Sequence, residues 1–302
     1  MEPAQRDAGG FFADALWRPA HRPDGLRPQG REQAANPRRA VRRPESKFLS
    51  FDLPVDLVIG HMLEEVSGIG YDLRSGLAWA PVSPEAGAFR RLERQQPMEV
   101  GRVLLAFGNY YDPTGLFLAL DALESAPCEM EVQVLLPPAL RVHEAEIRRR
   151  GRNLNLVVLT DVPTVFPLLD RSDLLIGSYG NLTFEALCLG VPVVIVAIKE
   201  FMALYAARLE AEGCLVLAGE ARNLKPEHLA DRLRALDQVR RASLATVGQR
   251  LVDGLGLRRT ADLLNAWMNG PCLEASRNGD CCHEHPPHPS SVCQPKSRPL
   301  LK

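Results

Sequence analysis

The chain has 302 residues, of which 36 are Lys or Arg and 37 are Asp or Glu, so its net charge at neutral pH is −1. That balance argues against the capture of nucleic acid or anionic lipid as the main activity. No apolar run approaches the length of a membrane span. With the two ends set aside, roughly 220 residues are enough for one α/β domain and part of another.

Residues 1–50 are expected to form a disordered tail. Residues 1–47 contain nine arginines, six prolines and six acidic residues. Such a segment cannot bury enough apolar surface to offset the entropy lost on folding. It has no apolar core of a secretory signal, and its arginines lie among acidic residues without the stacked aromatics of a single-strand binder.

The next segment, 51–98, holds one short apolar run at 55–59, which predicts a buried strand. Residues 77–82 are expected to be extended, and a charged stretch follows at 90–94.

From residue 102 onward, short apolar runs alternate with longer amphipathic segments. This rhythm predicts a Rossmann-like α/β fold, with a parallel sheet covered by helices on both faces and ligands bound outside the carboxyl ends of its strands. The predicted strands are 103–107, 131–136, 154–159, 173–177, 193–196 and 214–218. The predicted helices are 114–124, 139–150, 163–169, 182–189, 201–212, 226–236, 240–251 and 258–268.

The stretch 173–196 reads as strand, glycine turn, helix, glycine stop and strand. Asn181 is expected to cap the helix, and Gly190 is expected to end it in a left-handed conformation. Free amides at the helix start favour a phosphate there. Glu185, one turn into the helix, either binds a pair of ribose hydroxyls or only complements the helix dipole on a solvated face.

The segment GSYGNLTFEALCLGVPVVIV resembles the nucleotide-sugar-binding segment in the C-terminal half of GT-B proteins of the MurG type. It is closer still to the PseG family, the hydrolases of a UDP-diacetamido-trideoxyhexose in pseudaminic acid synthesis. Their turn G-G-S-T-x-x-E carries the acidic residue that holds the uridine ribose, which corresponds to Glu185. The resemblance runs from about residue 56 to about residue 264, and it includes the D-G-L-G at 253–256.

The resemblance implies that 51–98 is the remnant of an N-terminal GT-B domain with its linker, and that 99–268 is the nucleotide-sugar-binding domain. The loop at 108–113 resembles the turn G-G-x-D-P that faces the diphosphate, although Asn109 replaces its second glycine. The two tyrosines that follow crowd the site, stack on a sugar or only cover the sheet edge, and Asp112 is expected to cap the following helix. The residues expected to bind the UDP-sugar are Gly108, Asn109, Asp112, Ser178, Tyr179, Gly180, Asn181, Leu182, Thr183 and Glu185.

The second tail is expected at 269–302. It contains the tract CCHEH at 281–285, but the spacing is not that of a zinc finger, and three prolines follow closely, so no metal site is predicted. Four of the seven cysteines lie in this tail, and the other three lie in or beside core elements. This distribution does not suggest a disulfide framework, so we expect a protein of the reducing cytoplasm.

The sequence offers no residue for acid–base catalysis, because His21 lies in the first tail and His61 does not match the catalytic histidine of the PseG family. Three interpretations stay open. The chain is a UDP-sugar-binding GT-B half, related to PseG-like hydrolases or to family 28 glycosyltransferases, with its catalytic half altered, missing or supplied by another polypeptide. It is a non-catalytic binding module on the same fold. Alternatively, residues 1–47 come from a misread frame that replaces the true N-terminal domain. No cofactor is expected.

Overall fold

A computed structural model of the chain describes residues 57–61, 72–125 and 129–269. These residues belong to one unit that begins at Pro54. Both predicted tails, including the CCHEH tract, lie outside the described residues, apart from Asn269. Among the helices in the described part, none is long and apolar enough to cross a membrane.

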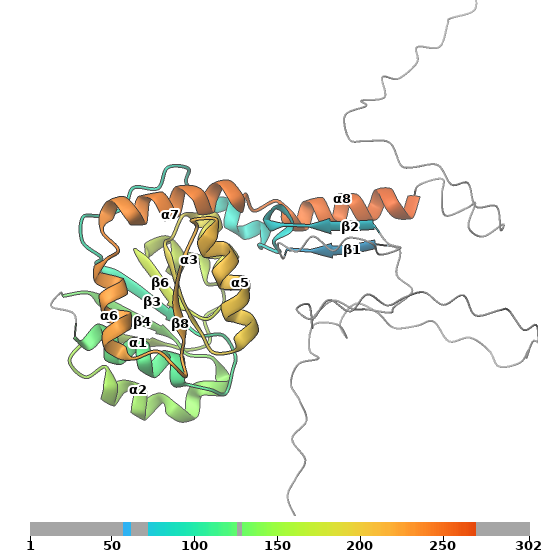
Figure 1. Cartoon of the computed structure of the whole chain (residues 1–302). Helices are drawn as coiled ribbons and strands as arrows, with labels where there is room; N and C mark the ends of the chain where they lie inside the picture. Colours follow the sequence, from blue (N-terminus) through green and yellow to red (C-terminus); the bar gives the residue numbers. More distant parts are fainter. Residues whose placement is uncertain (1–56, 62–71, 126–128, 270–302) are drawn as a thin grey trace, which may run out of the picture. The chain divides into compact units, whose positions relative to one another are not determined.

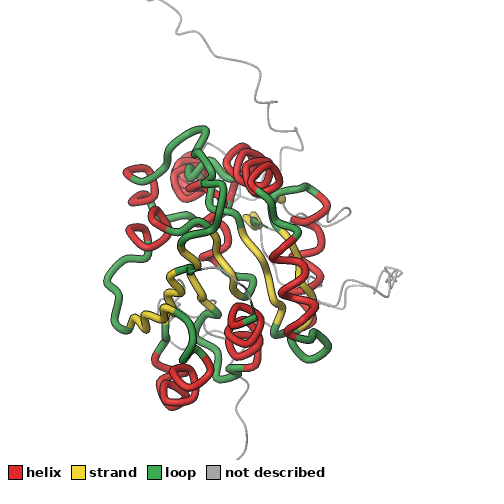
Figure 2. Tube along the Cα trace, turned by 90° about the vertical axis from the view of Figure 1, so that its left-hand side faces the viewer, coloured by secondary structure: helices red, strands yellow, loops and turns green. Residues whose placement is uncertain are grey.

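A six-stranded parallel sheet forms the centre of the fold, as predicted (Figures 1 and 2). Its strand order is β5-β4-β3-β6-β7-β8, and every neighbouring pair is parallel. The chain proceeds from β3 outward to β5 and then returns to the other side of β3 to place β6. The order therefore reverses between β3 and β6, which is where open α/β sheets bind ligands. The strands are β3 (Arg102–Ala106), β4 (Glu131–Leu135), β5 (Asn155–Leu159), β6 (Leu174–Gly177), β7 (Val193–Ala197) and β8 (Val216–Glu220).

Helices cover both faces of this sheet because its strands are apolar on both sides. On β3, Val103 and Leu105 pack into the cluster under one helical layer, and Leu104 and Ala106 pack into the cluster under the other. The first layer holds α1 (Thr114–Glu124), α2 (Glu144–Arg150) and α6 (Pro226–Arg234). The second holds α3 (Phe166–Arg171), α4 (Asn181–Leu189) and α5 (Glu200–Ala211). A 3-10 turn, η3 (Pro138–His143), precedes α2, and α7 (Gln238–Leu251) packs against α4 before α8 (Gly256–Asn269).

Two further strands, β1 (Leu57–Gly60) and β2 (Asp72–Ser75), form a separate parallel pair. The 3-10 turns η1 (Leu77–Trp79) and η2 (Pro84–Ala88) follow. The prediction of an extended 77–82 segment was therefore wrong at its start. Gly76, with a φ of 118°, ends β2, and its carbonyl accepts a hydrogen bond from the Trp79 amide. Leu77 and Val82 are buried in the main core from this turn, so their apolar character does not mark a strand.

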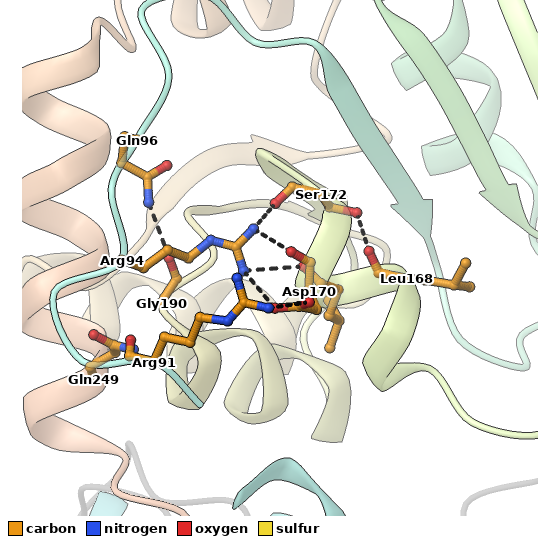
Figure 3. A network of polar contacts seen from close by, with 9 residues as sticks. Arg91, Arg94, Gln96, Leu168, Asp170, Ser172, Gly190 and Gln249 are labelled. Atoms are coloured by element: carbon orange, nitrogen blue, oxygen red, sulfur yellow. Dashed lines mark hydrogen bonds and ion pairs between the residues drawn. The ribbon is translucent and has the colours of Figure 1, made fainter. Parts of the chain in front are cut away.

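Residues 90–98, which we call the linker strap, cross the amino ends of the central strands (Figure 3). The guanidinium of Arg94 donates to the carbonyls of Asp170 and Ser172 at 2.8 and 2.7 Å, just before β6. Gln96 donates to the carbonyl of Gly190 at 3.2 Å, just before β7. In return, Gln249 of α7 donates to the carbonyl of Arg91 at 2.7 Å. The strap thereby satisfies backbone groups that the sheet and helices leave open.

Candidate nucleotide-sugar site

The two loops singled out in the sequence meet at the carboxyl ends of β3 and β6. Ala106 pairs with Gly177 in the sheet register, and beyond this pair Ser178 Oγ donates a 2.9 Å hydrogen bond to the carbonyl of Phe107. A Cβ on Gly177 would lie 2.1 Å from the Ala106 carbonyl oxygen, so the strands can approach here only with glycine. The predicted position of both loops at one sheet edge is confirmed.

Polar side chains within the β3 loop hold its own backbone. Gly108 adopts a φ of 70°, which favours glycine. Asn109 Oδ1 accepts a hydrogen bond from the amide of Ala139 at 3.2 Å, which ties the loop to the segment after β4. Asp112 Oδ1 accepts from the amide of Thr114, the first residue of α1, at 2.9 Å. The N-cap of α1 is Pro113, so the prediction of Asp112 as the cap was wrong by one position.

The two tyrosines of this loop differ in position. The ring of Tyr110 lies over the glycine turn, because a Cβ on Gly108 would be 3.3 Å from its Cε2 atom and 3.8 Å from Ser178 Oγ. Tyr111 is 80% exposed and does not cover the turn. A ligand placed between the loops would therefore meet the Tyr110 ring, either as a stacking surface or as a group that must rotate away.

The start of α4 corrects one prediction. Asn181 is not the N-cap but the first helical residue, and Gly180 is the N-cap. The hydroxyl of Thr183 reaches back to accept a hydrogen bond from the Gly180 amide at 3.2 Å, so the helix start is closed without the Asn181 side chain. Within the described residues, the amides of Asn181 and Leu182 have no hydrogen-bond partner. They are the free donors that a helix start offers to an anion.

Tyr179 and Leu182 pack inward. Tyr179 is 9% exposed, and its ring lies 5.7 Å from the ring of Phe184 and 5.7 Å from that of Tyr205. Burial raises the pKa of its hydroxyl above the ordinary value. Leu182 is partly buried against the same core cluster. At these two positions the backbone is the part available to a ligand.

Glu185 is half-buried on α4, and its carboxylate has no hydrogen bond or ion pair with any described residue. Burial without a compensating partner disfavours the charged form and raises the pKa of this carboxyl to about 7. Glu185 is thus unlike the surface carboxylates of the fold. A carboxylate held in this state has two acceptor oxygens for hydroxyl donors supplied by a ligand.

His61 was not predicted as a site residue, yet it lies beside α4. It directly follows β1, and its ring meets the ring of Phe184 edge-on, with a centroid distance of 4.8 Å. The available signal was its position immediately after the carboxyl end of a strand, where functional residues of parallel sheets gather. In the described ranges, no group of three or more His, Cys, Asp or Glu residues could hold a metal ion.

Comparison with known proteins places the fold. No protein-family model matches the chain. Over 109 residues it is 31% identical to an uncharacterized protein of Methanocaldococcus jannaschii, MJ1062; the match covers 34% of this chain and 22% of that protein. The structure is similar to MurG of Acinetobacter baumannii, with a TM-score of 0.54 and 17% identity over 69% of this chain and 59% of MurG. A UDP-GlcNAc 2-epimerase of Neisseria meningitidis bound to UDP-GlcNAc gives a lower TM-score, 0.42, at 14% identity over 60% of this chain and 47% of the epimerase.

The described domain therefore has a GT-B-like fold, with a six-stranded parallel sheet flanked by helices. The chain spans about a fifth of the archaeal protein and less than two thirds of MurG.

Proposed function

We propose that the chain binds a nucleoside diphosphate sugar, with uridine as the nucleoside, at the carboxyl edge between β3 and β6. The observation that carries this proposal is the meeting of the two glycine loops at the start of α4, the helix that carries Glu185, a half-buried carboxylate with no hydrogen-bond or ion-pair partner among the described residues. A site at the point of strand-order reversal is where this class of sheet binds its ligands.

Each part of the ligand has a matching group. Glu185 would accept hydrogen bonds from the two ribose hydroxyls, because its oxygens are acceptors and lack a protein donor. The diphosphate would lie on the free amides of Asn181 and Leu182, at the positive end of the α4 dipole. The turn at Gly108 would approach the diphosphate from the other loop, because glycine allows close contact with the backbone. The preference for uridine follows from the resemblance of this segment to PseG and MurG.

For the reaction, we propose the release of UDP from a UDP-diacetamido-trideoxyhexose, as in the PseG family. The GT-B fold supports a nucleotide-sugar substrate, and the resemblance at residues 177–196 and 253–256 supports this hydrolase. In this proposal 99–268 is the nucleotide-binding domain. Residues 51–98 are the end of an N-terminal GT-B domain with its linker. The catalytic part of that half is missing, altered or supplied by another polypeptide.

Calorimetric titration of UDP into the purified chain tests the binding proposal. Glu185→Gln removes the negative charge but keeps the shape, and it should weaken UDP binding by about tenfold or more, because a charge-assisted hydrogen-bond pair is lost. Glu227→Gln is the matched control, since Glu227 is an exposed carboxylate in the first turn of α6. The absence of any binding of uridine nucleotides, or equal affinity in the two variants, would contradict the proposal.

A further inference from the structure

His61 stands at the carboxyl end of the small sheet. It is the first residue after β1, and β1 and β2 run parallel, so the carboxyl ends of both strands lie at one edge. Gly60 is held there by a 3.1 Å hydrogen bond from the Gly76 amide to its carbonyl. The position is equivalent to that of Gly108 and Ser178, which follow the carboxyl ends of β3 and β6 in the large sheet.

The contact with Phe184 joins the end of β1 to α4, the helix that follows β6. The rings of His61 and Phe184 meet at an interplanar angle of 73°, and Phe184 is fully buried in the first turns of α4. Phe184 also contacts Tyr179 of the β6–α4 turn, and it immediately precedes Glu185. The imidazole of the small sheet therefore lies against the helix that carries the candidate ribose-binding carboxylate.

The imidazole of His61 is half-buried. Neither ring nitrogen has a hydrogen-bond partner in the part of the chain that the structure describes, and neither is among its buried unpaired atoms, so both are open to solvent or to a ligand. Burial lowers the pKa of His61 below its ordinary value, so the ring is neutral at pH 7. A neutral imidazole offers one donor and one acceptor, which suits hydroxyl and amide groups better than phosphates.

We propose that His61 completes the nucleotide-sugar site from the second sheet and hydrogen-bonds the sugar, while Glu185 and the two loops bind the nucleotide. This inference rests on the proposed function. In the proposed site, groups of the large sheet bind the ribose and the diphosphate. The sugar is therefore the remaining part of the ligand that His61, at the carboxyl end of the small sheet, can contact. His61 is then a specificity residue, and its loss affects only ligands that carry a sugar.

His61→Phe separates this role from a structural one, because phenylalanine keeps the edge-on contact with Phe184 but has no nitrogen. Calorimetry would compare UDP, UDP-glucose and UDP-GlcNAc on the wild-type chain and the variant. We expect the UDP affinity to stay within about twofold and the affinity for the preferred UDP-sugar to fall about five- to tenfold, as for one lost hydrogen bond. Unchanged affinities for all three ligands would overturn the inference.

NMR spectroscopy provides a second test, because it detects the imidazole of His61 directly. The Cε1–H resonance of His61, assigned by its absence in His61→Phe, should shift with the preferred UDP-sugar more than with UDP. Equal shifts with both ligands, or none, would also overturn the inference. Failure of the underlying function looks different, because the wild-type chain would then bind none of the uridine nucleotides and Glu185→Gln would have no effect.

Discussion

The two edges of the large sheet differ in how their backbone groups are paired, although the side-chain atoms Gln96 Oε1 and Asp170 Oδ1 are buried at the amino edge without a hydrogen-bond partner among the described residues. At the amino edge, Arg94 and Gln96 of the linker strap donate to carbonyls before β6 and β7 (Figure 3). Asp173 accepts from the amides of Gly101 and Arg102 at 2.9 and 2.8 Å. At the carboxyl edge, the Glu185 carboxylate and the first amides of α4 have no partners among the described residues.

This difference separates stability from binding. Groups that are paired within the protein stabilise the fold, and they are not available to a ligand. Polar groups without a partner in the protein can bind a ligand without first breaking internal hydrogen bonds. Substitutions at the amino edge should therefore change the free energy of unfolding. Substitutions of open groups at the carboxyl edge should change affinity.

Gly177 is the main exception among residues of the carboxyl edge, because a substitution there should change stability. At this position the backbones of β3 and β6 are in close contact. Gly177→Ala should cost about 4 kcal/mol or prevent folding, because the new methyl group would lie 2.1 Å from the Ala106 carbonyl oxygen in the neighbouring strand. Urea unfolding followed by circular dichroism measures the loss. Gly180→Ala is the control, with no atom within 4 Å of its added Cβ, and it should cost about 1 kcal/mol or less. Equal stability of the two variants would show that β3 and β6 are not as close as described.

At the amino edge, Arg94→Ala should destabilise the chain by about 3 kcal/mol. The Arg94 side chain is 14% exposed, and its removal leaves the carbonyls of Asp170 and Ser172 without donors. Arg91→Ala is the matched control, since the Arg91 side chain is 71% exposed and its ion pair with Asp170 should contribute about 1 kcal/mol or less. Denaturant midpoints of both variants, with UDP affinity as a second readout, test the comparison. A large loss of affinity in folded Arg94→Ala would contradict the separation of the edges.

Glu185 should make the affinity for a UDP-sugar depend on pH. With the pKa of its carboxyl near 7, the group binds ribose hydroxyls best when ionised, so the affinity for a UDP-sugar should rise about tenfold from pH 6 to pH 8. A UDP-sugar is the suitable ligand, because its diphosphate has no ionisation in this range, whereas a terminal phosphate titrates near pH 6. Glu185→Gln should show weak, pH-independent binding. A wild-type affinity that is flat with pH would refute the ribose assignment.

The same carboxyl should lower stability as the pH rises. Its folded-state pKa is raised, so the stability it contributes is present below about pH 4.5 and is lost as the pH rises through about 7. Glu185→Gln should therefore be more stable than the wild-type chain at pH 8 and about equal to it near pH 4.5, as measured by urea unfolding at the two values. A variant less stable at pH 8 would mean that the carboxylate has a favourable partner in the free protein.

The smallest expected effect concerns Asp112, a predicted site residue whose carboxylate accepts a hydrogen bond from the first amide of α1. Asp112→Ala should cost about 1 kcal/mol through loss of the hydrogen bond from Thr114. Asp237→Ala should cost a similar amount, because Asp237 caps α7 by accepting from the Arg240 amide at 2.7 Å. If Asp112 also contacts the ligand, only its own variant will change UDP affinity in calorimetry. Equal UDP affinities of the two variants would limit Asp112 to a structural role at the start of α1.

The sequence predicted the sheet, its helices and the edge at which the loops meet, because buried parallel strands and glycine stops leave local patterns. It also singled out Glu185 through a local motif, and its role as a site residue stays a prediction. The strand predicted at 55–59 is observed as β1, but β2 and its pairing with β1 were not predicted. The Thr183 hydrogen bond at the start of α4 was also missed, because it depends on which polar group reaches the Gly180 amide. His61 was not predicted as a site residue, for a different reason. Its contact with Phe184 joins positions more than a hundred residues apart, and no spacing in the sequence indicates such a pair.

The hydrogen bond from Ser178 to Phe107 links residues that are 71 positions apart in the chain. β3 precedes its neighbour β6 by two strands in the chain, so two outward crossovers and one return crossover must be completed before the two loops meet. Non-local pairing of this kind slows folding. A ligand that needs both loops therefore recognises only chains that have finished folding, and it would act as a late stabiliser during synthesis rather than as a nucleus for collapse.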